Sequence, residues 1–145
     1  MCSSDLMGIE TGSPHILRVI NKGETHETIS KAIELLKNYN IRVKGFFIVG
    51  LPSESPESIK QMEDFILSNN LDDIDFTIFQ PYKKSHIYEN KHLYDIQWDN
   101  IDLQKSWYKG LPESYNSQVW TSKMSQRDIV EARIYLEQKY KKWIQ

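Results

Sequence analysis

Residues 41–52, IRVKGFFIVGLP, decide the fold class of this 145-residue chain. Their centre, Phe46 to Val49, is apolar without the alternation of a half-exposed strand, which is typical of a strand covered on both faces in a parallel sheet. Gly50 and Pro52 then end the strand, because neither residue supports a continuing ladder. The stretch therefore predicts a buried parallel strand, and parallel strands need crossover connections, usually helices, between them.

The sequence after this strand predicts one helix and a further strand. Ser55 and Pro56 form an N-cap followed by proline at the first helical position, and the helix is expected to end at residues 69–70. Residues 72–82, DDIDFTIFQPY, are rich in β-branched and aromatic residues up to Pro81 and predict a strand. The inner face of the helix is expected to consist of Ile59, Met62, Phe65 and Ile66.

Two helices are predicted before the strand. Ser13 and Pro14 repeat the cap-and-proline device and begin a short helix that ends near Ile20, whereas Thr25 caps a second helix that ends at residues 38–40. The order of strand end, helices, strand, helix and strand favours βαβ units and a parallel α/β fold. The buried stripe of the second helix is predicted to contain Ile29, Ala32, Ile33, Leu36 and Tyr39.

The last part of the chain has a different character. Residues 83–123 show no sustained period and predict irregular structure with short turns. A capping-box-like start at Ser125 begins a final helix. We expect Trp98, Trp107 and Trp120 to anchor the irregular segment by packing. The residues expected to face inward from the final helix are Ile129, Ala132, Leu136, Tyr140 and Trp143.

Composition narrows the possible functions. The net charge of −2 gives no sign of a nucleic-acid-binding face, and no apolar run reaches the roughly 20 residues of a membrane-spanning helix. Cys2 is the only cysteine, which excludes disulfides within the chain, and the N-terminal residues do not resemble a secretory signal. The four histidines lack the spacing of metal ligands. We therefore expect a cytoplasmic protein with no metal site of its own.

Residues 1–6, MCSSDL, need separate treatment. Cys2 to Leu6 is what the end of a common sequencing adapter encodes, so we interpret this segment as a non-native sequencing scar and exclude it from fold reasoning. The alternative is a genuine polar N-terminal tail.

Three predicted strand ends carry the residues suited to a ligand. They are residues 8–13 (GIETGS), 48–52 (IVGLP) and 78–81 (IFQP). In parallel α/β barrels ligands bind at the carboxyl ends of the strands. The Glu10 carboxylate can accept hydrogen bonds from ribose hydroxyls or an ammonium group, glycines permit close approach, and free strand-end amides and carbonyls can read an adenine edge.

These motifs together resemble the radical S-adenosylmethionine enzymes, specifically the group that often carries an N-terminal cobalamin-binding domain. GIETGS resembles the family's strand-4 motif, KGFFIVGLPSES (residues 44–55) its strand-5 motif, and FTIFQPYKKSHIYE (residues 76–89) its strand-6 segment. The resemblance implies that residues 7–90 form the C-terminal half of a partial (β/α)6 TIM-like barrel with parallel strands. Residues 91–145 would form a C-terminal extension that ends in a helix.

The resemblance implies S-adenosylmethionine as cofactor, cleaved beside a 4Fe-4S cluster to a 5′-deoxyadenosyl radical, with cobalamin a further cofactor wherever a cobalamin domain accompanies the barrel. Glu10 would face the ribose or the methionine end, Ile48 and Gly50 would pack on the adenine, and the backbone near Phe79 and Gln80 would bond its edge. The implied cofactor-binding residues are Glu10, Thr11, Ser13, Ile48, Gly50, Phe79 and Gln80; the resemblance assigns no catalytic residue and no substrate.

The chain departs from the family pattern in ways that bear on activity. The three cysteines that hold the cluster are absent, as is the glycine-rich strand-2 end, and iron–sulfur clusters need thiolate ligands. We therefore expect an inactive fragment whose partner is the N-terminal half of its own barrel. Ser53 and the pair Lys83-Lys84 stand where the family usually has glycine and Pro-Gly.

Two other functions remain open from the sequence. One is half of an unrelated barrel enzyme, such as a phosphate-binding aldolase-like protein, for which Lys44 would supply a lysine on a strand. The other is a non-catalytic α/β domain that binds a protein partner through the aromatic segment 83–123.

Overall fold

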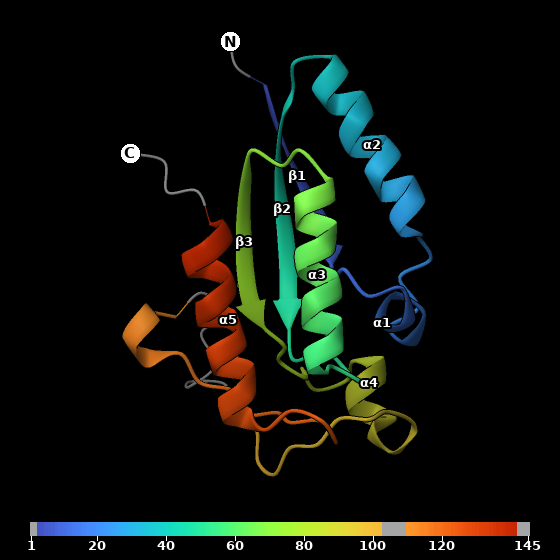
Figure 1. Cartoon of the computed structure of the whole chain (residues 1–145). Helices are drawn as coiled ribbons and strands as arrows, with labels where there is room; N and C mark the ends of the chain where they lie inside the picture. The colour runs from blue at the N-terminus through green and yellow to red at the C-terminus, as the bar shows by residue number, and fades with distance from the viewer. Residues whose placement is uncertain (1–2, 103–109, 142–145) are drawn as a thin grey trace.

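The computed structural model describes residues 3–102 and 110–141. Its core is a three-stranded sheet in the order β1-β2-β3, with both strand pairs parallel. The elements are β1 (Ser4–Glu10), α1 (Pro14–Val19), α2 (His26–Asn38), β2 (Arg42–Val49), α3 (Pro56–Ser68), β3 (Asp73–Ile78), α4 (His86–Glu89) and α5 (Gln126–Tyr140), with 3-10 helices at Lys91–Leu93 and Pro112–Ser114 (Figure 1). This α/β order is the one expected, and it agrees with part of a TIM-like barrel.

The helices begin where the capping signals predict. The Ser13 hydroxyl accepts from the Ile16 N–H, and Thr25, Ser55 and Ser125 each form a capping box at the start of α2, α3 and α5. Each cap satisfies an N–H that has no partner inside its own helix. Local chemistry thus sets the helix starts, independently of what the helices later pack against.

The strand β1 begins earlier than expected. Ser4, Asp5 and Leu6 pair with Arg42, Val43 and Lys44 of β2, so part of the segment 1–6 belongs to the sheet. The side chains of residues 4–6 are exposed, which shows that this part of the strand is held by backbone pairing and contributes little to the core. Residues 4–6 are thus part of the sheet, and the non-native origin of residues 1–6 stays a prediction.

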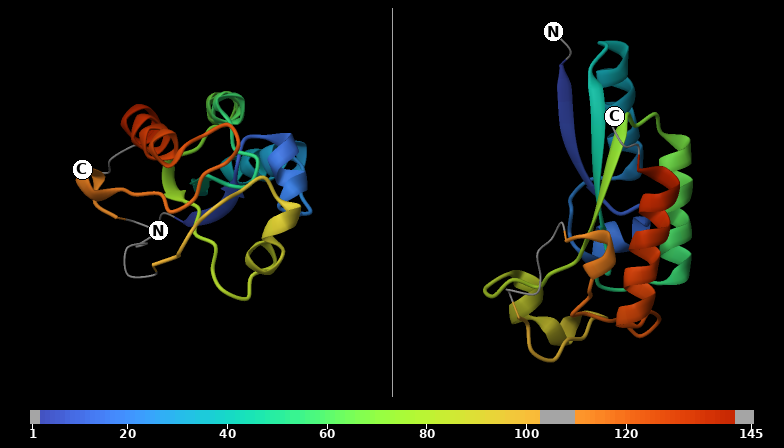
Figure 2. Two further views of the ribbon diagram at one scale, coloured as in Figure 1. Left: turned by 90° about the horizontal axis from the view of Figure 1, so that it is seen from below. Right: turned by 90° about the vertical axis from the view of Figure 1, so that its left-hand side faces the viewer.

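One face of the sheet is covered and the other is open. Figure 2 shows α2, α3 and α5 on the same side of the three strands. Along β2 the residues Val43, Phe47 and Val49 are buried under these helices, whereas Phe46 and Ile48 on the other face are only half-buried. The expectation of a strand covered on both faces is thus wrong for the described residues.

The core is continuous from the sheet into the C-terminal part of the chain. Phe47 stacks on Phe76 with ring centroids 5.7 Å apart, and residues after position 90 join the same cluster. Trp98 is buried and Trp120 is half-buried, whereas Trp107 and Trp143 lie outside the described residues. Tyr39, predicted to be inward, is 72% exposed because it follows α2 as its C-cap. The later residues of the cluster are Ile96, Trp98, Val119, Met124, Ile129 and Leu136.

Ion pairs tie the amino ends of the strands together. Lys44 Nζ lies 2.8 Å from Asp73 and 2.9 Å from Asp75, and Lys141 lies 2.9 Å from Asp75. Burial alone would raise the pKa of Asp75, but its bonds to Lys44 and Lys141 outweigh burial and lower the pKa.

No helix within the described residues has the length and apolar character that a lipid bilayer requires.

Candidate functional site at the carboxyl edge of the sheet

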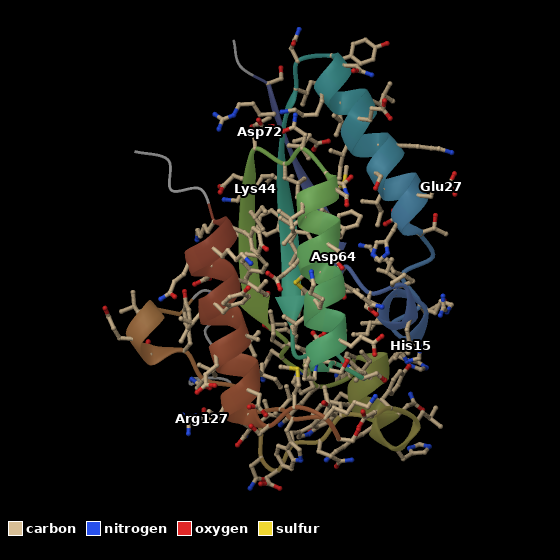
Figure 3. The ribbon with its side chains drawn as sticks, viewed as in Figure 1. His15, Glu27, Lys44, Asp64, Asp72 and Arg127 are labelled. Carbon is tan, nitrogen blue, oxygen red and sulfur yellow. The ribbon has the colours of Figure 1, made fainter. Side chains whose placement is uncertain are left out.

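The three predicted ligand segments meet at one edge of the sheet. The parallel registers place Glu10 beside Phe47 and Val49 beside Ile78, so all three strands end side by side (Figure 1). Figure 3 labels His15 near this edge and Lys44 near the opposite end of the strands. The lysine that an aldolase-like site would use thus lies away from the carboxyl edge, engaged by two aspartates.

Glu10 has an unusual backbone conformation and a fixed carboxylate. Its φ is +71°, in the left-handed region, and the register of β1 slips between Gly8 and Glu10. Its Oε1 lies 3.1 Å from Nζ of Lys22, with side-chain exposures of 22% and 26%. A Cβ on Gly8 would lie 2.8 Å from the same oxygen, so glycine at position 8 makes room for the carboxylate. Non-glycine residues in this region cluster at functional sites.

Thr11 and Ser13 serve the turn that follows. Both are buried, and the Thr11 hydroxyl accepts from the Ser13 N–H at 3.1 Å. The Thr11 carbonyl accepts from Nε2 of His26 at 2.8 Å, which joins the end of β1 to the start of α2. These contacts give both predicted site residues a structural role in positioning the strand end.

Gly12 is required by close packing. A Cβ at this position would lie 2.3 Å from Cα of Met62 and 2.6 Å from the Gln61 carbonyl oxygen. The turn after β1 therefore lies directly against the backbone of α3. The second glycine of the GIETGS segment is explained by this helix contact.

The end of β2 offers one half-buried side chain and a glycine turn. Ile48 lies on the open face, whereas Gly50 is buried with φ of +85°. A Cβ on Gly50 would lie 3.0 Å from Cγ2 of Ile129, so a side chain at this position would crowd α5. The glycine is thus explained by its backbone conformation and by helix packing.

Glu54 is a fully buried carboxyl group that the sequence analysis did not single out. It accepts from the Gly50 N–H at 3.0 Å and from the Ser58 hydroxyl, and the Thr121 hydroxyl donates to its carbonyl at 2.7 Å. Burial raises the pKa of Glu54 to about 7, although the Ser58 hydroxyl and the N–H groups of Gly50 and Leu51 favour the charged form. Glu54 joins the end of β2 to the start of α3. The signal in the sequence that could have identified Glu54 is that it is the single acidic residue between Gly50 and the N-cap Ser55.

The end of β3 leaves hydrogen-bonding groups without partners. The Phe79 N–H donates to the Val49 carbonyl at 2.8 Å, which extends the pairing with β2 by one residue. Within the described residues, neither the backbone N–H nor the carbonyl of the next residue, Gln80, takes part in a hydrogen bond. The side-chain Nε2 of Gln80 is also buried without a partner there.

The departures from the family glycines fall at left-handed positions. Ser53 has φ of +69° and Lys84 has φ of +68°. Glycine adopts this conformation at little cost, whereas other residues do so with strain. The structure therefore keeps the backbone shape for which glycine is suited and places a serine and a lysine in it.

The segment after β3 crosses the carboxyl edge and is fastened there. Figure 2 shows residues 80–100 beneath the strand ends, on the side opposite α3 and α5. The Ser53 N–H donates to the Asp95 carbonyl at 2.9 Å, and Asp95 accepts from Ser122. Tyr88 stacks on Trp98, whose carbonyl accepts from Lys91. These bonds bind the segment to the loop between β2 and α3.

Comparison with known proteins adds independent information. Residues 6–66 match the family model described as the radical SAM superfamily. An uncharacterized methyltransferase of Pyrococcus horikoshii is 32% identical over 108 residues, covering 74% of this chain and 22% of that protein. The bacteriochlorophyllide d C-12(1)-methyltransferase of Chlorobaculum tepidum is 26% identical over 104 residues, covering 70% of this chain and 23% of that enzyme.

A third similar protein modifies tRNA according to its name. The tRNA-2-methylthio-N(6)-dimethylallyladenosine synthase of Buchnera aphidicola is 34% identical over 99 residues, covering 67% of this chain and 21% of that enzyme. The chain thus spans about a fifth of the length of these relatives. The names of these relatives cover different reactions.

Proposed function

The chain belongs to the radical S-adenosylmethionine superfamily, and from that premise we propose that the carboxyl edge of β1, β2 and β3 binds the adenosyl group of S-adenosylmethionine. The observation that carries this proposal is the backbone of Gln80, which has no hydrogen-bond partner within the described residues and lies two residues after the end of β3. One N–H and one carbonyl from the same residue match the acceptor N1 and the donor N6 amino group of adenine.

Glu10 is proposed to bind the sugar or the methionine end. Oε1 of its carboxylate is held by Lys22, which fixes the side chain while Oε2 can accept a ribose hydroxyl or an ammonium group. Ile48 on the open face supplies an apolar surface between Glu10 and Gln80. The residues of this edge therefore fit an adenosyl ligand, and the chemistry that the bound cofactor supplies in this superfamily begins with its one-electron reduction.

The residues of the chain do not fit a 4Fe-4S cluster. Such clusters are held by thiolates, and the sequence contains one cysteine. No group of three or more histidine, cysteine, aspartate or glutamate side chains is placed to hold a metal within residues 3–102 and 110–141. We therefore propose that the chain alone is inactive and that the cluster ligands come from polypeptide outside it.

The open face of the sheet supports a second half of the barrel as the partner. Leu6 is 65% exposed, and Phe46 and Ile48 are half-buried on the same face. Among the described residues β1 is an edge strand of the sheet, and edge strands present unpaired backbone groups that promote association with another strand. The resemblance implies that such a face is buried inside a barrel, and the matched residues make up only about a fifth of each relative. A cobalamin domain in the full-length protein and a cytoplasmic location remain proposals that rest on the motifs and on the cysteine content.

The proposal is tested by titrating the isotope-labelled 145-residue chain with S-adenosylhomocysteine and recording backbone amide spectra. We expect shifts at Glu10, Ile48 and Gln80 and none at Lys60 or Asp64, which pair on the exposed side of α3. E10Q should weaken binding, whereas E27Q on the exposed face of α2 serves as the matched control. Unmoved amides at the carboxyl edge at saturating ligand would refute the proposal.

A further inference from the structure

Gln80 carries the one buried side-chain polar atom that lacks a hydrogen bond among the described residues. This atom is Nε2, and it lies just after β3, between Phe79, which bonds to β2, and the buried Pro81. A buried amide donor without an acceptor is unfavourable, because it loses its water and gains no partner. Native proteins rarely retain such groups unless a ligand or another function uses them.

No acceptor for Nε2 lies within the described part of the chain. The position of Gln80 at the proposed adenosyl site suggests that the ligand supplies the acceptor. If the Gln80 backbone pairs with N1 and the N6 amino group of adenine, two ring acceptors of the base remain, N3 and N7. Nε2 is covered in the free chain, so the side-chain N–H of the same residue can donate to one of them once the Gln80 side chain turns toward the ligand. A pyrimidine has no counterpart of N7, whereas its O2 is an acceptor comparable to N3.

We propose that Gln80 is a specificity-determining residue whose side-chain amide donates a hydrogen bond to N3 or N7 of the purine of the adenosyl ligand. This inference rests on the proposed adenosyl site and adds to it a side-chain contact to the base, which distinguishes a purine from a pyrimidine where the acceptor is N7. The unpartnered donor of the free chain is then the donor that recognises the ligand, and its cost in the free chain is offset on binding.

The test compares the wild-type chain with Q80M, which keeps a side chain of similar length and removes the donor. The probes are adenosine, 3-deazaadenosine and 7-deazaadenosine, titrated by amide spectra of the 145-residue chain. We expect Q80M to bind adenosine about tenfold more weakly, as for the loss of one good hydrogen bond. The deaza analogue that lacks the accepting nitrogen should bind the wild type about tenfold more weakly than adenosine does. The same analogue should bind Q80M as well as adenosine binds Q80M.

Thermal unfolding separates recognition from a structural role. Because Nε2 has no partner to lose, Q80M should unfold at the same temperature as the wild type or higher. Q138M on the exposed face of α5 is the matched control and should change neither affinity nor stability. A Q80M chain that binds adenosine as the wild type does would overturn the inference while leaving the adenosyl site in place. The inference would also be overturned if, for both deaza analogues, the affinity lost through Q80M and the affinity lost through the analogue simply added. A wild-type chain that binds none of the probes would refute the adenosyl site and this inference together.

Discussion

Nζ of Lys22 lies 3.1 Å from Oε1 of Glu10, so a lysine from the turn after α1 holds the carboxylate at the end of β1. Both side chains are about three-quarters buried, in contrast to the exposed pair Glu27 and Lys31 on α2. Partial burial reduces screening by solvent and salt, so the first pair is expected to interact more strongly.

A double-mutant cycle tests this pair. We expect K22M and E10Q to show a coupling in the free energy of unfolding of about 1 kcal/mol, because both side chains are largely sheltered from water. The same cycle with K31M and E27Q should yield only about 0.3–0.5 kcal/mol, as for exposed helical pairs. Urea unfolding measures both. Equal couplings would contradict the assignment of Lys22 as the residue that positions Glu10.

Ser53→Gly is expected to stabilise the chain. Ser53 has φ of +69°, a conformation that costs a non-glycine residue about 1–2 kcal/mol, whereas glycine adds about 0.5–1 kcal/mol of chain entropy to the unfolded state. The net gain should therefore be up to about 1.5 kcal/mol, and the N–H bond to Asp95 is kept. Ser53→Ala is the control and should bring no such gain. Destabilisation by glycine in urea unfolding would disprove the strain argument.

Gly12→Ala is expected to damage the packing of α3. Its Cβ would lie 2.3 Å from Cα of Met62, which is helix backbone and cannot move as a side-chain tip does. We expect a loss of at least about 3 kcal/mol in the free energy of unfolding, at the severe end of overpacking. Gly23→Ala, where φ is +75° but no atom lies within 4 Å, should cost only about 1–2 kcal/mol. Comparable losses for the two variants in thermal unfolding would argue against the close contact.

Glu54 should make stability fall as the pH rises. Its pKa is raised from 4.5 to about 7 in the folded chain, so between these values the folded state binds more protons than the unfolded state. The stability that Glu54 contributes is therefore fully present below its unfolded pKa and is lost as the pH passes its folded pKa. E54Q keeps the shape of the side chain without titrating.

The measurement is urea unfolding of the wild type and E54Q from pH 5 to pH 8. The stability of the wild type relative to E54Q should fall by roughly 3 kcal/mol across this range, since each pKa unit corresponds to about 1.4 kcal/mol. Taking the difference removes the opposite contributions of Asp72 and Asp75, whose pKa values are lowered in the folded state. A difference that stays constant with pH would show that the Glu54 carboxyl titrates normally.

Much of the fold could be predicted because its signals are local. Ser13, Ser55 and Ser125 cap their helices through contacts three residues away, and the predicted helix starts are confirmed. The strands followed from β-branched and aromatic content: β2 ends at Val49, where Gly50 and Pro52 were expected to stop it, whereas β3 ends at Ile78, before the Pro81 that was expected to stop it. Patterns within a short stretch of sequence thus predict the presence of a helix or strand well, and the end of a strand less well.

The site was predictable only as a set of segments. Three strand ends could be located in the sequence, and the parallel registers place them at one edge. The sequence did not predict that Lys22 would hold Glu10, that Gly12 would contact α3, or that Glu54 would be buried. Each of these contacts depends on how close two segments lie after folding, and this distance cannot be read from their spacing along the chain.

The sequence by itself determined the parallel α/β order, the helix caps and the superfamily, because these depend on periodicity, on side-chain to backbone bonds within a turn, and on linked motifs. Only the tertiary structure decided which face of β2 stays open, which oxygen of Glu10 is taken, and which donor at Gln80 has no acceptor. Burial and hydrogen-bond pairing are properties of atoms brought together from distant segments, so they exist only once the strands and helices have packed.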